Sequence, residues 1–341
     1  MNKKINIGLV GLGRLGSNYA NYIKYRIPNA NLLAISDINE NLAKSCAKEL
    51  IVSKYYKNYQ DLIADKEIDA VVVVTSTSTH KNIIVEATKQ RKAIFCEKPL
   101  TLSLKEAYEI KQAIEDTGVF FHMGFMRRFD KGYAAAKRKI DGGMIGKPVV
   151  FKSSSRDPYR PSLEYTDPNI SGGLFTDMGI HDFDLARWFM GEVKSVYSMG
   201  GTLAYPEMNE IGDIDNGITN INFVNGTLGV VDLSRNGVYG YDIRTEILGT
   251  KGTLKIGYLR ETPILVMSKE GISHDTVPYF MERFGDAYIA QLQDFVAKVL
   301  NEKEPSITCA DGIAALQISL SAKLSFEQNR QIEIQKLKLN T

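Results

Sequence analysis

The sequence has few cysteines, no long apolar run and no large excess of charge of either sign. Its three cysteines are scattered and odd in number, so they form neither a disulfide framework nor a metal-ligand spacing (Cys46, Cys96 and Cys309). We therefore expect three reduced thiols in a cytoplasmic protein.

No apolar stretch approaches the roughly 20 residues that an α-helix needs to cross a bilayer. The N-terminus leads from Met1 directly into a strand pattern, without the apolar segment and cleavage site of a signal peptide. The formal net charge is +2, which gives no reason to expect nucleic acid or an anionic membrane as partner. These absences leave a small molecule as the expected partner.

The strongest positive signal is a glycine-rich turn near the N-terminus. An apolar run at residues 5–10 is followed by G-x-G-x-x-G and then by an amphipathic stretch that ends near Tyr25. In this strand–turn–helix context the glycines permit a tight turn, a close approach to pyrophosphate and close helix packing. We expect the loop to bind a dinucleotide through Gly11, Gly13, Arg14 and Leu15.

An acidic residue at the end of the second apolar run supports the same assignment. Asp37 follows Gly13 at near the expected distance of about 20 residues, where a carboxylate can accept both ribose hydroxyls and would repel a 2′-phosphate. This position favours NAD over NADP. The alternative is that Asp37, with Asn39, only caps the following helix.

Two further strand ends belong to the same expected edge of a parallel sheet, where ligands bind. The β-branched run at residues 70–74 is followed by a polar loop, which we expect to contact the cofactor (Thr75, Ser76, Thr77 and His80). The run at residues 93–96 is followed by Glu97-Lys98-Pro99. Because proline pushes the preceding residue into an extended conformation, we expect Lys98 to have a fixed position just beyond a strand.

The length of 341 residues predicts two domains, since one domain usually takes about 100–200 residues. We place them at residues 1–123 and 124–341. The first is expected to be α/β with a parallel sheet. The second shows strand patterns separated by hairpin turns, including a strand at residues 264–268, which predict an α+β domain with a mainly antiparallel sheet open on one face.

The second domain also carries an acid–histidine pair. Apolar spacing predicts a helix from Phe175 onward, which places Asp177 and His181 on one face, one turn apart. A carboxylate that orients an imidazole can make a general base. The same pair can be purely structural. It can also bind metal, but such a site normally takes three or four protein ligands and only two are present, so we expect no metal.

Together these motifs resemble the glucose–fructose oxidoreductase/inositol dehydrogenase family. The resemblance rests on the glycine motif, Glu97-Lys98-Pro99 and Asp177-x-x-x-His181, and it covers nearly the whole chain. Further segments are similar to the inositol 2-dehydrogenases (residues 95–100, 124–129, 156–158 and 239–242). The resemblance implies a Rossmann domain, an open-faced sheet domain used in oligomer contacts, and commonly a homotetramer.

The resemblance also implies roles for individual residues. His181 takes the hydroxyl proton of the substrate, while Lys98 holds the reacting oxygen and, with Asp177, fixes His181. The cofactor contacts include Glu97, Lys98, Met126 and Arg127. The substrate contacts are expected to be Lys98, Met126, Ser155, Asp157, Asp177, His181 and Tyr239.

The sequence thus predicts an NAD-dependent dehydrogenase of a cyclic polyol, with myo-inositol first and scyllo-inositol next. Ser155 departs from the pattern of bacterial inositol enzymes with histidine there, which leaves the isomer open. The alternatives are a dehydrogenase of a sugar and a non-catalytic, NAD-binding sensor. A sensor has no need for Lys98, Asp177 and His181 together.

Overall fold

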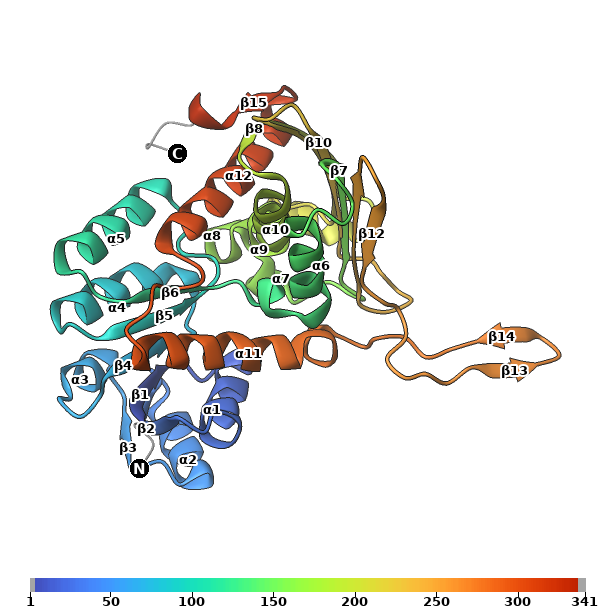
Figure 1. Cartoon of the computed structure of the whole chain (residues 1–341). Helices are drawn as coiled ribbons and strands as arrows, with labels where there is room; N and C mark the ends of the chain where they lie inside the picture. Colours follow the sequence, from blue (N-terminus) through green and yellow to red (C-terminus); the bar gives the residue numbers. More distant parts are fainter. Residues whose placement is uncertain (1–3, 337–341) are drawn as a thin grey trace. The chain divides into compact units, whose positions relative to one another are not determined.

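The computed structural model describes residues 4–336 and divides them into two compact units (Figure 1). The first comprises residues 4–126 and 288–313, and the second comprises residues 127–287 and 314–336. The first unit therefore ends three residues beyond the predicted boundary at 123. It also takes in a C-terminal segment that the sequence analysis assigned to the second domain.

The first unit alternates strands and helices. In chain order these are β1 (Ile5–Val10), α1 (Arg14–Arg26), β2 (Ala30–Ser36), α2 (Glu40–Leu50), β3 (Lys54–Tyr56), α3 (Tyr59–Ala64), β4 (Ala70–Val73), α4 (Thr77–Lys89), β5 (Ala93–Glu97), α5 (Leu104–Thr117) and β6 (Phe121–Gly124). The strands form one parallel sheet in the order β3-β2-β1-β4-β5-β6. This order is that of a dinucleotide-binding Rossmann sheet, which confirms the predicted fold.

Aromatic packing explains why residues 288–313 belong to the first unit. They include most of α11 (Phe280–Leu300) and the start of α12 (Cys309–Gln328). Phe295 packs edge-on against Phe95 with ring centroids 5.7 Å apart, and Tyr288 packs against Tyr19 at 5.9 Å. The apolar face of a C-terminal helix thus completes the core of the N-terminal sheet.

The second unit is built on a seven-stranded sheet in the order β12-β11-β7-β10-β9-β8-β15, in which β7 and β10 are parallel and the other pairs antiparallel. Its strands are β7 (Pro148–Arg156), β8 (Val193–Gly201), β9 (Asn216–Phe223), β10 (Leu228–Ser234), β11 (Asp242–Gly249), β12 (Thr253–Ile256) and β15 (Ile332–Glu333). The predicted mainly antiparallel sheet is confirmed.

Helices cover one face of this sheet, with α10 against β7 (Figure 1). Besides the start of α11 and most of α12, the helical segments are η1 (Met126–Phe129), α6 (Lys131–Asp141), α7 (Leu163–Thr166), α8 (Pro168–Ser171), α9 (Gly173–Asp177), α10 (Ile180–Met190), η2 (Pro206–Ile211) and η3 (Ile334–Lys336). The other face exposes alternate residues, among them Ile218, Leu228 and Leu248. The open face predicted from the alternation is present.

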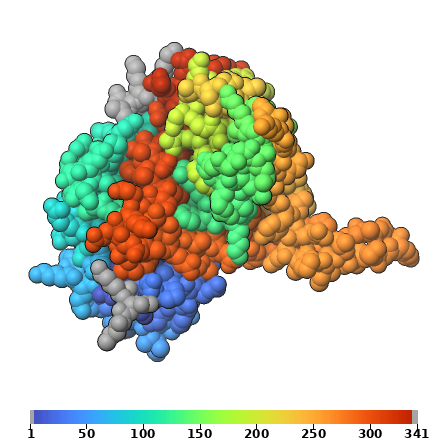
Figure 2. Space-filling view, in the orientation of Figure 1, coloured from blue at the N-terminus to red at the C-terminus, as the bar shows by residue number. Residues whose placement is uncertain are grey.

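A separate hairpin, β13 (Val266–Ser268) and β14 (Gly271–Ser273), stands clear of the rest of the second unit (Figure 2). The prediction that the strand at residues 264–268 belongs to the main sheet is wrong. Met267 pairs with Ile272 within the hairpin, and both side chains are exposed. Period-two alternation indicates a strand but not its partner.

Within residues 4–336 no helix combines the length and apolar character needed to cross a membrane. The same described range holds no group of three or more His, Cys, Asp and Glu side chains placed to hold a metal ion.

Candidate active site

The glycine loop joins β1 to α1, and each glycine meets a different requirement. Gly11 has φ +96°, and a Cβ there would lie 2.5 Å from the carbonyl oxygen of Val74. A Cβ on Gly16 would lie 2.1 Å from the Gly11 oxygen, so this glycine lets the helix pack on the turn. A Cβ on Gly13 would meet nothing within 4 Å. Gly13 is thus unnecessary for packing within the chain, and its bare backbone suits a ligand that approaches closely.

The start of α1 matches the needs of an anion. Gly13 is the N-cap of α1 and has no side chain to bond the first helical N–H groups, and the first turn contains no acidic residue. Helix N-termini of this kind bind phosphate through backbone N–H groups and the helix dipole. The loop residues predicted to bind NAD therefore fit a pyrophosphate.

Asp37 supports the glycine loop directly. Its Oδ2 accepts a hydrogen bond from the Leu12 backbone nitrogen at 2.8 Å, and its Oδ1 accepts one from Asn39 at 2.9 Å. The N-cap of α2 is Asn39, whose side chain accepts from Leu42 N at 3.2 Å. Capping thus falls to Asn39, and Asp37 lies beside the expected pyrophosphate loop. Its contact with the ribose stays a prediction.

His80 connects the loops after β4 and β5. The buried ring has Nδ1 2.9 Å from the carbonyl oxygen of Pro99 and Nε2 3.2 Å from that of Thr75. Burial lowers the pKa of the imidazole. His80 therefore holds together the two strand ends that carry Thr75 to Thr77 and Lys98. A direct cofactor contact by His80 stays a prediction.

Glu97 is the centre of a buried polar network that the sequence analysis did not find. Tyr19 and Gln291 both donate to Glu97 Oε1, Gln291 at 3.1 Å, and Gln291 Nε2 also lies 2.5 Å from the Tyr19 hydroxyl. Glu97 Oε2 accepts from the backbone nitrogen of Lys98 at 3.1 Å. Burial raises the pKa of the Glu97 carboxyl. Glu97, which was predicted to contact the cofactor, thus fixes the backbone from which the Lys98 side chain extends.

Lys98 itself is half-buried at the carboxyl end of β5, where the sequence predicted it. The Lys98–Pro99 peptide bond is cis. Met126, predicted to contact both substrate and nicotinamide, is buried at the end of the first unit.

In the second unit, Ser155 and Arg127 belong to one buried cluster around Asp182. Ser155 Oγ donates to Asp182 Oδ2 at 2.7 Å, and Arg127 Nη1 donates to Asp182 Oδ1 at 2.9 Å. Ser153 donates to the same carboxylate at 2.5 Å. Both Ser155 and Arg127 therefore have structural partners. Their predicted contacts with substrate and cofactor stay predictions.

Asp177 and His181 lie on two short helices. The prediction of one continuous helix from Phe175 is wrong, because α9 ends at Asp177 and α10 begins at Ile180. A Cβ on Gly179 would lie 2.8 Å from Leu233 Cδ1 and 2.7 Å from the Phe175 oxygen. The break between α9 and α10 coincides with this tightly packed glycine. The spacing of apolar residues does not reveal such a break, so it could not be predicted from the sequence.

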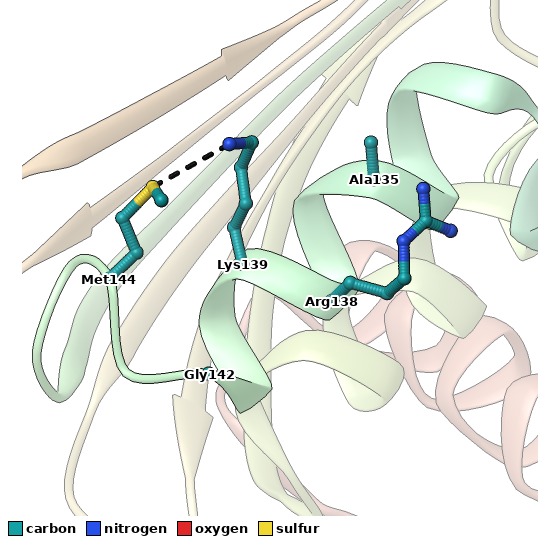
Figure 3. A pocket seen from close by; sticks show the side chains of 5 residues that line it. All are labelled: Ala135, Arg138, Lys139, Gly142 and Met144. Atoms are coloured by element: carbon teal, nitrogen blue, oxygen red, sulfur yellow. Dashed lines mark hydrogen bonds between the residues drawn. The ribbon is translucent and has the colours of Figure 1, made fainter.

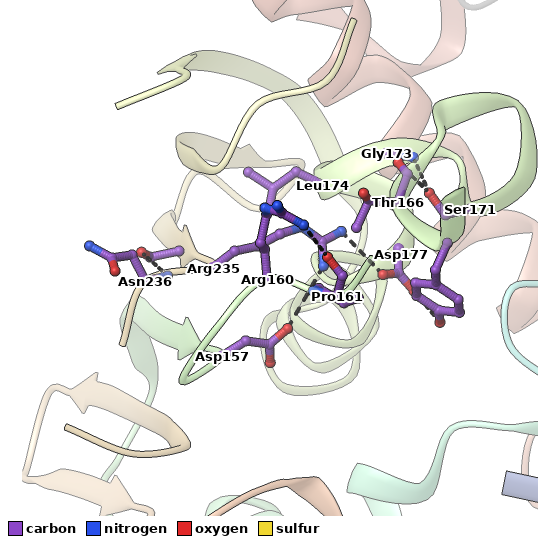
Figure 4. A network of polar contacts seen from close by, with 12 residues as sticks. Asp157, Arg160, Pro161, Thr166, Ser171, Gly173, Leu174, Asp177, Arg235 and Asn236 are labelled. Carbon is purple, nitrogen blue, oxygen red and sulfur yellow. Dashed lines mark hydrogen bonds and ion pairs between the residues drawn. The ribbon is translucent and has the colours of Figure 1, made fainter. Parts of the chain in front are cut away.

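A buried arginine accompanies Asp177 and Asp157 (Figure 4). Arg235 Nη2 donates to Asp177 Oδ2 at 3.2 Å, and its Nη1 lies 3.8 Å from Asp157 Oδ2. Tyr165 donates to the other oxygen of Asp177 at 3.3 Å. Arg235 was not predicted from the sequence, although its place directly after a strand is a weak signal. Tyr239, the remaining predicted substrate residue, is exposed and donates to Asp242 at 2.7 Å.

A shallow hollow lies elsewhere on the second unit, at the C-terminal end of α6 (Figure 3). It is lined by Ala135, Arg138, Lys139, Gly142 and Met144, and Lys139 Nζ lies 3.7 Å from the Met144 sulfur. None of these residues was predicted to act on substrate or cofactor. We therefore assign this hollow no role.

Known proteins resemble both units. The family described as "Oxidoreductase family, NAD-binding Rossmann fold" matches residues 5–125, and "Oxidoreductase family, C-terminal alpha/beta domain" matches residues 137–334. The scyllo-inositol 2-dehydrogenase (NAD(+)) of Bacillus subtilis (strain 168) is 40% identical over 335 residues, which cover 98% of this chain and 97% of that protein. The myo-inositol 2-dehydrogenase of Thermotoga maritima is 38% identical over 335 residues, covering 98% and 99%.

Solved structures show the same similarity. The crystal structure of scyllo-inositol dehydrogenase from Lactobacillus casei with bound cofactor NAD(H) and scyllo-inositol gives a TM-score of 0.93 at 34% identity. It covers 98% of this chain and 100% of that chain.

Proposed function

Because this chain belongs to the glucose–fructose oxidoreductase/inositol dehydrogenase family, we propose that it is an NAD-dependent dehydrogenase that oxidises a secondary hydroxyl of an inositol to a ketone. The observation that carries the proposal is the glycine loop, where Gly13 leaves open space beside an uncapped helix N-terminus. Relatives named for scyllo- and myo-inositol differ little in identity to this chain, 40% and 38%. Both isomers are therefore proposed as substrates.

The proposed roles follow from the chemistry of each side chain. His181 accepts the hydroxyl proton, since a neutral imidazole nitrogen can act as a general base. The Lys98 ammonium donates a hydrogen bond to the reacting oxygen, and Asp177 and Asp157 accept hydrogen bonds from hydroxyl groups. When bound, the nicotinamide supplies the acceptor for the hydride that leaves the same carbon. The pyrophosphate and the adenosine ribose of the dinucleotide are held by Gly11, Gly13, Arg14, Leu15 and Asp37.

The proposal is tested by initial-rate reduction of NAD with a panel of substrates. We expect turnover with myo-inositol or scyllo-inositol and much slower turnover with glucose and xylose, with NADP as the cofactor control. Turnover of sugars alone would assign the chain to a different activity of the family. Binding of NAD with no turnover of any polyol would contradict the dehydrogenase and favour a sensor.

Asp37 provides a test of cofactor choice. Replacing Asp37 with alanine should weaken NAD binding about tenfold and bring the preference for NAD over NADP close to unity, because the charge that repels a 2′-phosphate is lost. The matched variant Asp37→Asn keeps one oxygen to accept from Leu12 N but removes the charge. The kcat/KM ratio for the two cofactors measures the effect. An unchanged ratio in both variants would leave Asp37 with only its support of the loop.

We further propose a homotetramer in the cytoplasm. The outer sheet face of the second unit exposes Ile218, Leu228 and Leu248 at 49%, 53% and 41%, which suits contacts between copies. Cys46, Cys96 and Cys309 are free thiols, as is usual for proteins of a reducing compartment.

A further inference from the structure

One arginine of the second unit lies beneath two carboxylates that the proposed function assigns to the substrate. The Arg235 side chain has 0% exposure, whereas those of Asp177 and Asp157 retain 12% and 15%. Its Nη2 bonds Asp177 at 3.2 Å, and its Nη1 faces Asp157 at 3.8 Å (Figure 4). A ligand can therefore reach the carboxylates while the guanidinium stays behind them.

The fold places Arg235 and Asp157 side by side for a topological reason. β7 and β10 are the one parallel pair in the sheet of the second unit, within the described part of the chain, and Ser234 is in register with Arg156. The next residues, Arg235 and Asp157, therefore leave adjacent strand ends together. Asp157 N donates to the Ser234 oxygen at 2.9 Å, and Gly237 N donates to the Asp157 oxygen at 2.7 Å. The backbone thus fixes both residues before their side chains interact.

A third carboxylate, that of Asp213, interacts electrostatically with this arginine. Asp213 Oδ1 accepts from Leu174 N at 3.1 Å, and among the described residues its buried Oδ2 has no hydrogen-bond partner. Burial raises the pKa of Asp213, and the neighbouring Asp177 raises it further, whereas Arg235 lowers it. Three acidic side chains therefore share one buried cation. Removing that cation would take away the guanidinium that bonds Asp177 and lies near Asp157, at an energetic cost because these carboxylates are partly buried.

We propose that Arg235 is a positioning residue for the dehydrogenase reaction, which holds the Asp177 and Asp157 carboxylates in place to accept hydrogen bonds from substrate hydroxyl groups. The assignment rests on the proposed function. A fixed pair of acceptors suits a cyclic polyol, because neighbouring ring hydroxyls present donors at fixed spacing. Arg235 acts through the two carboxylates and does not itself touch the substrate.

The test compares Arg235→Met and Arg235→Lys with Arg128→Met. Arg128 is a matched control, because it is also buried in the second unit and bonds a buried carboxylate, Asp184, at 2.6 Å. We expect Arg235→Met to lower kcat/KM for inositol about 100-fold with a raised KM, and Arg235→Lys to recover about tenfold of that loss. Arg128→Met should keep kcat/KM within about threefold of the wild type despite a lower melting temperature. NAD affinity should stay unchanged in all three.

A double-mutant cycle separates positioning from general destabilisation. If Arg235 acts through Asp177, Arg235→Met should reduce kcat/KM far less in an Asp177→Asn background than in the wild type. Fully additive losses, or equal losses in Arg235→Met and Arg128→Met, would overturn the assignment. If Arg235→Met does not fold, Arg235→Lys is measured in its place, alone and combined with Asp177→Asn. The assignment is overturned if Arg235→Lys leaves kcat/KM unchanged in both the wild-type and the Asp177→Asn backgrounds. A wild-type protein that oxidises no polyol would instead overturn the proposed function, and the assignment with it.

Discussion

Replacing Lys98 with methionine is expected to lower kcat about 100- to 10,000-fold while NAD affinity stays within about threefold of the wild type. Methionine is unbranched and only one atom shorter than lysine, but it cannot donate a hydrogen bond to the reacting oxygen. The Glu97 network, which bonds the Lys98 backbone nitrogen, is left intact. Single-turnover rates and NAD titration by fluorescence measure the two quantities separately.

Lys81→Met is the matched control for Lys98→Met. Lys81 is also a lysine of the first unit, but its ammonium forms ion pairs with Glu106 and Glu109 at the surface. Losing it removes the same charge and should change kcat by less than about twofold, since surface ion pairs contribute little. A full kcat in Lys98→Met would exclude Lys98 from the chemistry. Equal losses in the two variants would indicate an effect of net charge alone.

Two alanine substitutions in the glycine loop are expected to differ in their effect on the free energy of unfolding. Gly16→Ala should lower the free energy of unfolding by about 3 kcal/mol, because its Cβ would lie 2.1 Å from the Gly11 oxygen, a backbone atom that cannot move aside freely. Gly13→Ala should change that free energy by less than about 1 kcal/mol, because its Cβ meets nothing within 4 Å and its φ is −61°. Denaturant unfolding measures both values.

NAD binding should be weakened more in Gly13→Ala than in Gly16→Ala, the reverse of their order in stability. In Gly13→Ala the new methyl group occupies the space expected for the pyrophosphate, so the dissociation constant should rise about tenfold or more, which corresponds to about 1.4 kcal/mol. The comparison is the NAD dissociation constant of Gly16→Ala, measured on its folded fraction at low temperature. Wild-type NAD affinity in Gly13→Ala would contradict the close approach of a ligand to this loop.

The sequence by itself determined the features that depend on neighbouring residues. The glycine turn, Asp37 at the end of β2 and Lys98 after β5 are readable because a strand, a turn and a helix leave local periodicities and spacings. The same signals predicted the parallel sheet of the first unit and the mainly antiparallel sheet of the second. The family followed from these motifs and is confirmed by similarity over nearly the whole chain.

Only the tertiary structure decided which distant side chains meet. Gln291 lies 194 residues from Glu97 in the sequence, yet it bonds the same carboxylate as Tyr19. Arg235 meets Asp177 across 58 residues, and it leaves the sheet beside Asp157 because β7 and β10 pair in parallel. Periodicity shows which face of an element is buried, but strand order and packing determine its partners. For that physical reason the sequence identified the candidate site residues, and the fold identified the buried groups that bond the Lys98 backbone and the Asp177 carboxylate.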